Sequence, residues 1–442
     1  MRLAPGQTPF WAGLDEAAQL LWLMRPLPAE AITSLYVHVP FCAQKCSYCA
    51  FYSEPSSGET INRYVSALIR EMELVATDLH PRTVFFGGGT PSLLNLRQWE
   101  QILRAMERLD LLGAAEWTVE CNPATVSLDK AKLLRSFGVN RISMGVQSLN
   151  EALLDRLGRV HTREMAFKSF DTLREAGFDN LNLDLMFAIP GQTLEVWRDT
   201  LDEALALGSE HLSSYEVIYE EDTALYAQLQ AGEAAEDEDL SCAMYDELVE
   251  HAAGAGFQQY EVANFARNSR GRGASRELEP APNSSVAKDL GSNGQSVTPA
   301  TLPMALPAFA CRHNVNYWRG GGFYGLGPSA TAYVRGVRTK NWSNTQLYCE
   351  QLERGKRATE SREELSPLGR AGETAAFGLR MVAGWPFTQF RQVTGYDLRR
   401  EWAGDMEQLA RQGWGRLTPE HFQLTAQGIR FADAAAQLFL RA

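Results

Sequence analysis

Six short β-rich segments alternate with helical segments between residues 35 and 217. The β-rich segments cover residues 35–40, 83–87, 116–121, 140–145, 180–187 and 212–217, and helical periodicity fills 62–79, 97–109, 128–137, 163–176 and 194–207. Because parallel neighbours need long crossover connections, this alternation predicts an α/β fold with a parallel sheet. The spacing fits an open doubly wound sheet or a partial barrel, and both bind ligands at the carboxyl ends of their strands.

Three of the seven cysteines lie directly after the first β-rich segment, as Cys42, Cys46 and Cys49 in the loop CAQKCSYC. The other four are scattered, as is usual for cysteines that act as small buried hydrophobic residues. A structural zinc ion normally has four Cys or His ligands, whereas three thiolates can hold a [4Fe–4S] cluster with one iron left open. The spacing therefore favours an iron–sulfur cluster, and zinc with a distant fourth ligand is the alternative.

Polar and glycine residues follow the ends of the other β-rich segments. The run GGGTP, which contains Gly88, Gly89 and Thr90, follows the second segment, and glycines there let the backbone approach a ligand or form a tight turn. Glu120 and Gln147 end the third and fourth segments. Asp184 lies inside the fifth, apolar segment, where a carboxylate is costly unless Arg159 or a polar cofactor pairs with it. Side-chain alternation would turn Tyr36, on the first segment, toward the same end of the sheet, where the cluster loop lies.

Composition excludes some functions. The net charge is −12, which argues against broad binding to nucleic acid or to anionic membranes. No apolar run approaches the roughly 20 residues of a membrane-spanning helix, and we read no secretory signal at the start. A cytoplasmic protein without a nucleic-acid partner is therefore expected.

Changes in composition divide the chain. We expect an N-terminal extension over 1–33 and a β/α core over 34–265. Residues 266–308 are rich in Gly, Ser, Pro and Asn, and we predict a disordered insertion there, because the segment has too little apolar surface to bury. Residues 309–362 would complete the core. Helices followed by a turn-rich hairpin predict a C-terminal α+β unit of winged-helix type over 363–442.

The loop CAQKCSYC resembles the cluster loop of the radical S-adenosylmethionine (SAM) superfamily, whose core is a partial (β/α)6 barrel. The resemblance implies a [4Fe–4S] cluster on Cys42, Cys46 and Cys49, with SAM bound to the open iron. It also assigns SAM contacts, which are Tyr36, Tyr48, Gly88, Gly89, Thr90, Glu120, Gln147, Arg159 and Asp184.

Longer stretches resemble one branch of this superfamily, which holds the oxygen-independent coproporphyrinogen III oxidases and the HemW-type heme chaperones. The matching segments are YVHVPFCAQKCSYC, FFGGGTPS, NRISMGVQS, LGRVH, DLMFAIPGQT and HNVNYW. The oxidase loop has a further cysteine two positions after the third, where this chain has Phe51. The chaperones have the Cys-x-Phe ending found here, usually with Asp in place of Ala50. The loop therefore resembles the chaperones more closely.

The segment HNVNYW resembles the HNxxYW motif that is associated with heme binding in the chaperone branch. A neutral imidazole is a good axial ligand for heme iron, so the resemblance implies that His313 and Asn314 contact heme, with Tyr317 and Trp318 providing an apolar face. Cys311 is a second candidate for the axial ligand. Without the resemblance, a histidine packed in a loop is the simpler interpretation.

The function implied by the resemblance is that of a heme chaperone. Such a protein would bind heme and a SAM-ligated [4Fe–4S] cluster and transfer the heme to an acceptor hemoprotein. The alternatives are a coproporphyrinogen III oxidase, which decarboxylates its substrate by radical chemistry, and a radical SAM enzyme that acts on another substrate. Transient contact with membrane respiratory proteins and a homodimer are both left open.

Overall fold

The central element is a nine-stranded sheet with the strand order β7-β8-β6-β5-β4-β3-β2-β1-β9. The computed structural model describes residues 31–55, 57–269 and 306–441. Strands β1 to β6 pair in parallel in chain order, and β9 adds in parallel to β1. At the other edge β8 is antiparallel to both β6 and β7. The sheet is not closed, so the core is a partial barrel. The strands are β1 (Ile32–Val39), β2 (Leu79–Gly88), β3 (Glu116–Cys121), β4 (Arg141–Gln147), β5 (Leu181–Phe187), β6 (His211–Glu216), β7 (Gln258–Glu261), β8 (Asn264–Ala266) and β9 (Tyr324–Leu326).

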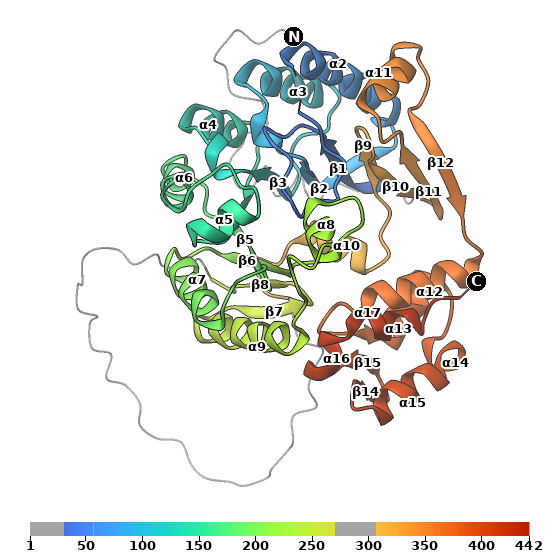
Figure 1. Ribbon diagram of the computed structural model, residues 1–442. Helices are drawn as coiled ribbons and strands as arrows, with labels where there is room; N and C mark the ends of the chain where they lie inside the picture. Colours follow the sequence, from blue (N-terminus) through green and yellow to red (C-terminus); the bar gives the residue numbers. More distant parts are fainter. Residues whose placement is uncertain (1–30, 56, 270–305, 442) are drawn as a thin grey trace, which may run out of the picture.

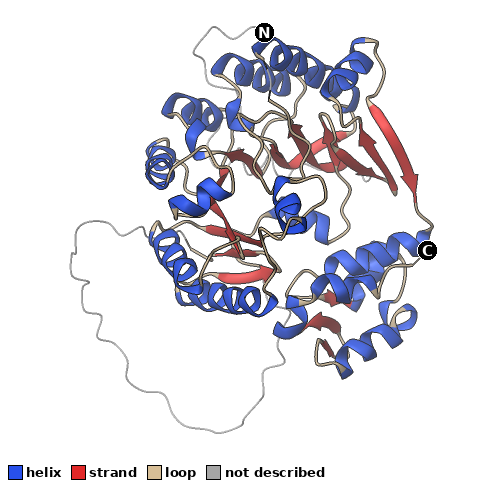
Figure 2. Ribbon diagram, viewed as in Figure 1, coloured by secondary structure: helices blue, strands red, loops and turns tan. Residues whose placement is uncertain are grey.

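Helices cover the outer side of the curved sheet, as Figures 1 and 2 show. Polar residues cap their starts: Asn95 and Gln98 form a capping box, and Thr162 and Thr193 each accept a hydrogen bond from a first-turn amide. The helices of this layer and of the loops that join it are α2 (Gly58–Val75), α3 (Leu96–Arg108), α4 (Leu128–Ser136), α5 (Glu151–Arg156), α6 (Arg163–Glu175), α7 (Leu194–Ala206), α8 (Ala224–Gln230) and α9 (Glu238–Gly254).

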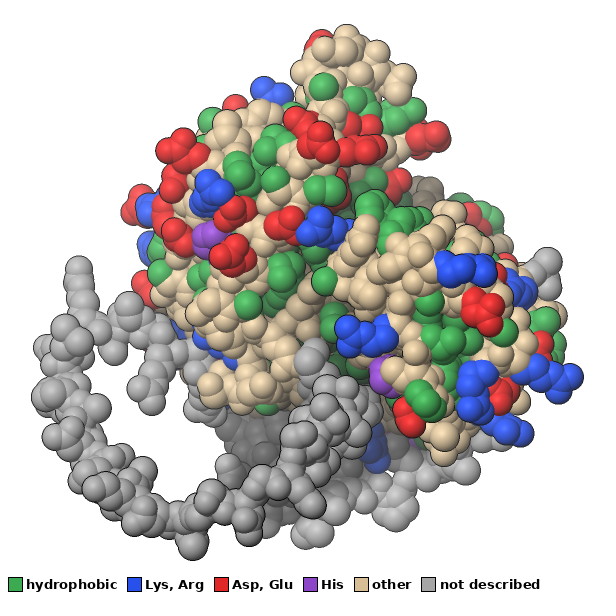
Figure 3. All heavy atoms as spheres, turned by 90° about the horizontal axis from the view of Figure 1, so that it is seen from below, with side chains coloured by type: hydrophobic (Ala, Val, Ile, Leu, Met, Phe, Trp, Pro, Cys, Tyr) green, Lys and Arg blue, Asp and Glu red, His purple; other side chains and the backbone are tan. Residues whose placement is uncertain are grey.

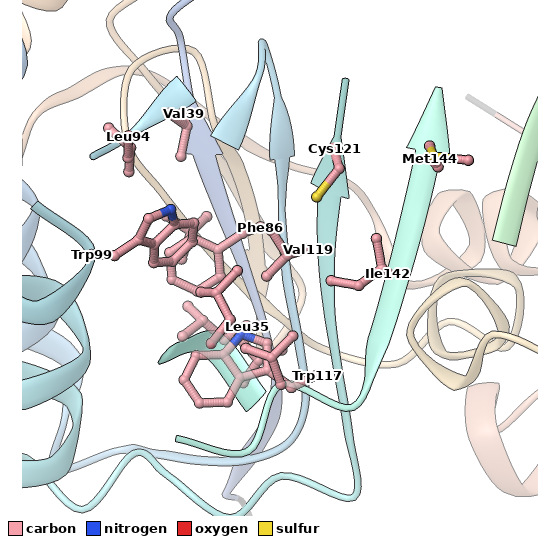
Figure 4. Close-up of a cluster of buried hydrophobic side chains, with 14 of the residues drawn as sticks. Leu35, Val39, Phe86, Leu94, Trp99, Trp117, Val119, Cys121, Ile142 and Met144 are labelled. Carbon is pink, nitrogen blue, oxygen red and sulfur yellow. The ribbon is translucent and has the colours of Figure 1, made fainter. Parts of the chain in front are cut away.

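The main hydrophobic core lies between the sheet and this helical layer. Figure 4 shows alternate side chains of β1 to β4, among them Leu35, Phe86 and Ile142, on the face that meets the helices. Trp99 of α3 and Trp117 of β3 are fully buried there, and Phe86 lies 5.2 Å from the ring of Trp99. Because one set of alternating residues is used for packing, the other set points into the barrel and is free to build a site.

A second, three-stranded antiparallel sheet continues from the β9 edge, with the order β10-β11-β12. Glu71 of α2 holds this part in place, because its buried carboxylate accepts hydrogen bonds from the Gly327 amide (2.8 Å), the Asn341 side chain (2.7 Å) and the Tyr348 hydroxyl (2.7 Å). Burial raises the pKa of Glu71 to about 6. The elements are α10 (Arg312–Trp318), β10 (Thr331–Val334), β11 (Val337–Asn341), α11 (Thr345–Glu353) and β12 (Thr359–Glu364).

The C-terminal part has a hydrophobic core of its own, built around Trp385, Phe390 and Trp402. Its small antiparallel sheet has the order β13-β15-β14, and helices precede and follow the hairpin. This agrees with the α+β unit predicted from the turn-rich segment. The elements are α12 (Pro367–Gly378), β13 (Trp385–Pro386), α13 (Phe387–Thr394), α14 (Leu398–Glu401), α15 (Ala403–Arg411), β14 (Gly415–Leu417), β15 (His421–Leu424), α16 (Ala426–Arg430) and α17 (Ala432–Gln437).

The predicted alternation is confirmed. All six β-rich segments form strands that pair in parallel within the nine-stranded sheet, and the segment 116–121 coincides with β3. Most of the predicted insertion, residues 270–305, and most of the N-terminal extension, residues 1–30, lie outside the described residues. Within the described ranges, no helix is long and apolar enough to cross a lipid bilayer.

Candidate functional site

Two cavities lie beside the cluster loop, residues 42–49. The larger, of about 480 Å³, contains the three clustered cysteines and is called here the cluster-loop cavity. The smaller, of about 420 Å³, is lined mainly by rings and is called the aromatic cavity. Ala50 and Phe51 line both, and the Phe51 side chain is 70% exposed. The residues after the third cysteine therefore form the boundary between the cavities.

The cluster-loop cavity brings together every predicted cluster and SAM residue except Tyr36. Its lining includes Cys42, Cys46, Tyr48, Cys49, Gly88, Gly89, Thr90, Glu120, Gln147, Arg159 and Asp184. These residues come from the ends of five neighbouring strands and from the loops that follow them, as expected for a parallel sheet. The assignment of each residue to a ligand stays a prediction.

The cluster loop is fixed from two sides. The backbone of Ser47 donates to the Leu157 carbonyl (3.0 Å) and accepts from the Leu225 amide at the start of α8 (2.8 Å). The Ser47 hydroxyl also donates to the carbonyl of Arg156 (2.9 Å). These contacts connect the loop to the LGRVH segment and to α8, so the cysteines project from an ordered backbone.

The glycines after β2 are required by close packing. Gly88 has φ +102°, and a Cβ on Gly89 would lie 2.7 Å from the carbonyl oxygen of Val39. The backbone here bonds to the end of β1, through Gly89 to Val39 (2.8 Å) and Thr90 to Phe41 (2.7 Å). Glycine therefore lets the second strand end lie against the backbone that leads into the cluster loop.

Two carboxylates face the same cavity. Burial and the neighbouring Asp184 raise the pKa of Glu120 to about 8, although its carboxylate accepts a hydrogen bond from the Gly88 amide (3.1 Å). Burial likewise raises the pKa of Asp184 to about 6. Asp184 accepts from Ser143 (3.1 Å) and Asn182 (2.7 Å), not from Arg159 as the sequence suggested. A cationic or hydrogen-bond-donating ligand would stabilise the ionised form of both groups.

Arg159 instead points toward the cysteines. Its guanidinium donates to the Gly145 carbonyl (2.6 Å) and to the Cys46 sulfur (3.4 Å). Its Nε atom is buried and has no protein partner within the described residues. Nearby, Gln147 has φ +65°, an unusual backbone conformation at the wall of the cavity. The positive charge of Arg159 would stabilise a bound group that includes negatively charged thiolates.

These residues fit an iron–sulfur cluster. In the described part of the chain no three His, Cys, Asp or Glu side chains converge on one metal ion. Such convergence is not required, because each cysteine of a [4Fe–4S] cluster binds a different iron. Three free cysteines on one cavity, with an arginine beside Cys46, match that donor set.

The aromatic cavity is lined by six aromatic rings and two imidazoles, together with a few hydroxyl and amide groups. Among its described lining residues there is no Asp, Glu, Lys or Arg. The lining consists of Tyr36, His38, Ala50, Phe51, Tyr52, Phe85, His313, Asn314, Tyr317, Phe323, Ser329 and Thr331.

His313 is buried at this cavity. Its Nδ1 lies 3.0 Å from the Thr83 hydroxyl, its Nε2 lies 2.8 Å from the Tyr317 hydroxyl, and its ring stacks on Phe85 at 5.3 Å. Burial lowers the pKa of His313 to about 3, so the imidazole is neutral at pH 7. The Nε2 atom can therefore act as a metal ligand once the Tyr317 hydroxyl moves away.

Helix α10 presents the rest of the HNVNYW segment to different surroundings. Asn314 and Tyr317 line the aromatic cavity. Trp318 lies outside it and packs between Phe377 (6.5 Å) and the Arg380 guanidinium (5.1 Å) of the C-terminal part. Cys311 is buried beside Glu116, and burial raises the pKa of its thiol to about 12. The structure therefore does not bring Trp318 or Cys311 to the cavity.

Several residues of the aromatic cavity were missed or misplaced by the sequence. Tyr36 was expected at the cluster mouth, but it lies in the aromatic cavity and its hydroxyl is 3.0 Å from Nδ1 of His38. His38 is not among the residues that the sequence predicts at a site. Its position two residues after Tyr36 on one strand is the signal that places both on the same face. Phe323 and Thr331 gave no signal, because this segment reaches the cavity through the non-local pairing of β9 with β1.

Known proteins resemble most of this chain. The Radical SAM superfamily matches residues 36–204, and the HemN C-terminal domain matches residues 365–431. The protein named heme chaperone HemW from Lactococcus lactis is 31% identical over 409 residues, covering 92% of this chain and 97% of the relative. HemW from Bacillus subtilis is 30% identical and covers 92% of this chain and 99% of the relative.

A solved structure shows the same fold. Coproporphyrinogen III oxidase (HemN) from Escherichia coli matches with a TM-score of 0.74 at 22% identity. The match covers 96% of this chain and 93% of the oxidase. The nine-stranded sheet and the C-terminal part are therefore arranged as in a known radical SAM enzyme.

Proposed function

The chain belongs to the radical SAM superfamily and, within it, to the family of the HemW heme chaperones, and from this premise we propose that it is itself a heme chaperone. It binds heme in the aromatic cavity and a SAM-ligated [4Fe–4S] cluster in the cluster-loop cavity, and it passes the heme to an acceptor hemoprotein. The observation that carries this proposal is a buried, neutral histidine in a ring-lined cavity that shares a wall with the cysteine cavity.

The cluster-loop cavity would hold its cofactors through groups that are already ordered. Cys42, Cys46 and Cys49 would bind three irons, and Arg159 would offset the negative charge beside Cys46. When bound, the cluster supplies single electrons to the SAM on its open iron. Glu120 and Asp184 would accept hydrogen bonds from polar groups of SAM, and the closely packed Gly88–Thr90 backbone would position them.

The aromatic cavity would hold heme by ring contacts and one axial ligand. His313 is neutral, and the stacked Phe85 ring fixes the orientation of its imidazole. Tyr36, Tyr317 and Phe323 offer faces or edges to a flat ligand. A hydroxyl that leaves Nε2 when iron arrives is compatible with reversible binding, which a chaperone needs in order to release its cargo.

An oxidase is the alternative, since the fold is shared with coproporphyrinogen III oxidase. The position where the resembled oxidases carry a further cysteine holds Phe51, whose exposed ring separates the two cavities. The relatives from Lactococcus lactis and Bacillus subtilis, at 31% and 30% identity, are named heme chaperones. Both observations favour heme binding over decarboxylation.

The test combines turnover and binding on the same protein. Anaerobically reconstituted protein is incubated with SAM, a strong reductant and coproporphyrinogen III, and the products are separated by chromatography. Hemin is titrated into a second sample. We expect no protoporphyrin and a saturable Soret change. Repeated turnover to protoporphyrin, or no Soret change, would contradict the proposal.

A further inference from the structure

We propose that the aromatic cavity accepts heme by its uncharged edge and leaves both propionates outside, so that the protein selects two-propionate porphyrins against four-propionate ones. This inference rests on the proposed heme binding and adds the orientation of the ligand and the basis of its selection. It follows from the charge and the size of the cavity and from one lysine at its rim.

The two cavities differ in charge. The cluster-loop cavity contains Glu120, Asp184 and Arg159, whereas the described residues that line the aromatic cavity contain no charged type. An ionised carboxylate that enters the aromatic cavity would lose its water and find no cation. Burial of an unpaired charge is strongly unfavourable, so an anionic substituent is excluded from the interior.

The exclusion of carboxylates would make the cavity select between porphyrins, because porphyrins differ in the number and placement of their propionates. Heme carries its two propionates on one edge and only methyl, vinyl and methine groups on the opposite edge. Coproporphyrin III carries a propionate on each of its four pyrroles, so none of its edges is free of charge. A cavity of about 420 Å³, toward the small end of the ~300–1,000 Å³ usual for ligand pockets, suits one apolar edge.

A lysine lies where an external propionate would need a partner. Thr331 on β10 lines the aromatic cavity, and its pairing partner on β11 is Lys340. Directly opposed residues of antiparallel strands share one face, with Cβ atoms about 4.5–5.5 Å apart. Lys340 is exposed and does not line the cavity itself, so we infer that its ammonium can reach a propionate that stays in solvent at this rim. The hairpin that carries it stands next to β9 in Figure 1.

The experiment uses three iron porphyrins, so that iron ligation is the same in each. Hemin, mesohemin (two propionates, ethyl groups in place of vinyls) and coprohemin III are titrated into the full chain and followed by the Soret band. We expect hemin and mesohemin to bind alike and coprohemin to bind at least about 100-fold more weakly, because one of its carboxylates would be buried without a partner.

Two substitutions examine the wall and the rim. Thr331→Lys places a cation in the cavity and should narrow the gap between coprohemin and hemin by at least about tenfold, because the buried carboxylate gains a partner. Lys340→Gln should weaken hemin about two- to fivefold, the range of an exposed ion pair. Lys168→Gln, an exposed lysine on α6, is the matched control and should leave all three affinities unchanged.

The outcomes separate the two levels of the argument. Equal affinities for hemin and coprohemin would overturn the selection by charge while leaving heme binding intact. An absence of hemin binding would overturn the proposed function and this inference together. A large preference for hemin that Thr331→Lys does not reduce would contradict the placement of the porphyrin in the aromatic cavity.

Discussion

The two cavities share a wall but differ in almost every other respect. The cluster-loop cavity contains charged side chains, namely Glu120, Asp184 and Arg159, and it is built from consecutive β/α units. The aromatic cavity has no charged residue type among its described lining residues. It combines β1 and β2 with α10, the β9–β10 segment and the residues just after the cluster loop. The charged cavity is therefore suited to a polar cofactor that stays bound, and the ring-lined cavity to a flat, largely apolar cargo.

This difference also explains how unequally the two cavities could be predicted. Cys42, Gly88 and Glu120 lie at or just after the ends of successive strands, and Asp184 lies within β5, so a parallel sheet alone brings them to one side. His313 lies on α10, 97 residues after the end of β6, the last parallel strand of the β/α series, and only the resemblance of HNVNYW pointed to it.

The largest effect is expected when one cavity loses its cofactor outright. Cys42→Ala should abolish the iron–sulfur absorbance after anaerobic reconstitution. The two remaining predicted ligands, Cys46 and Cys49, would hold only two irons of the cluster. Cys121→Ser is a demanding control, since Cys121 lines the same cavity but is not a predicted ligand. Absorbance retained in Cys42→Ala, or lost in Cys121→Ser, would refute the ligand assignment.

The next effect concerns the ring-lined cavity. His313→Ala should weaken hemin binding by about tenfold or more, which corresponds to about 1.4 kcal/mol or more, and should leave the iron–sulfur absorbance unchanged. Trp318→Phe is the control from the same helix, because Trp318 packs against Phe377 and Arg380 outside the cavity. Equal losses in the two variants would indicate damage to α10 in place of a lost ligand.

A smaller change in the opposite direction is expected at Tyr317. Tyr317→Phe removes the hydroxyl that occupies Nε2 of His313 but keeps the ring. Hemin binding should stay equal or become tighter, and hemin dissociation should become slower, because iron no longer competes with a hydrogen bond. Stopped-flow transfer of hemin to excess apomyoglobin measures that rate. Faster release from the variant would show that the hydroxyl supports heme binding and does not oppose it.

The least direct effect on either cavity is a pH dependence of stability, which arises at Glu71 near the aromatic cavity. Glu71 fixes Gly327, just before the cavity residues Ser329 and Thr331. Its pKa is raised from 4.5 to about 6, so its contribution to stability is complete below about pH 4.5 and is lost as pH rises through 6. The loss is at most about 2 kcal/mol.

Glu71→Gln tests this contribution. Between pH 4.5 and 7 the free energy of unfolding, measured with urea, should fall less in the variant than in the wild type, and the iron–sulfur absorbance should be unaffected. Glu353→Gln, at an exposed ion pair on α11, is the control. Parallel pH curves for the wild type and Glu71→Gln would show that this carboxyl is not the titrating group.

Sequence reasoning recovered most of the fold because the pattern was local. Each strand from β1 to β6 is followed along the chain by at least one helix, so the alternation can be read from neighbouring residues. The surface in Figure 3 shows the mixed acidic and basic side chains of an ordinary exposed face. Sequence reasoning placed Tyr36 on the inner face of β1 but not in one of the two cavities, because alternation gives the face of a strand and not the cavity that the side chain lines. It could not separate Tyr317 from Trp318, since neighbouring residues of a short helix point in different directions.

The central claim is that heme binds at His313, in a cavity that binds heme whether or not the cluster is present. The most direct measurement is a hemin titration of the cluster-free variant Cys42→Ala/Cys46→Ala/Cys49→Ala, with and without His313→Ala, followed by electron paramagnetic resonance of the complexes. The account predicts near wild-type hemin affinity and a histidine-ligated spectrum in the cluster-free protein, both lost with His313→Ala. Identical spectra with and without His313, or no hemin binding in the cluster-free protein, would contradict it.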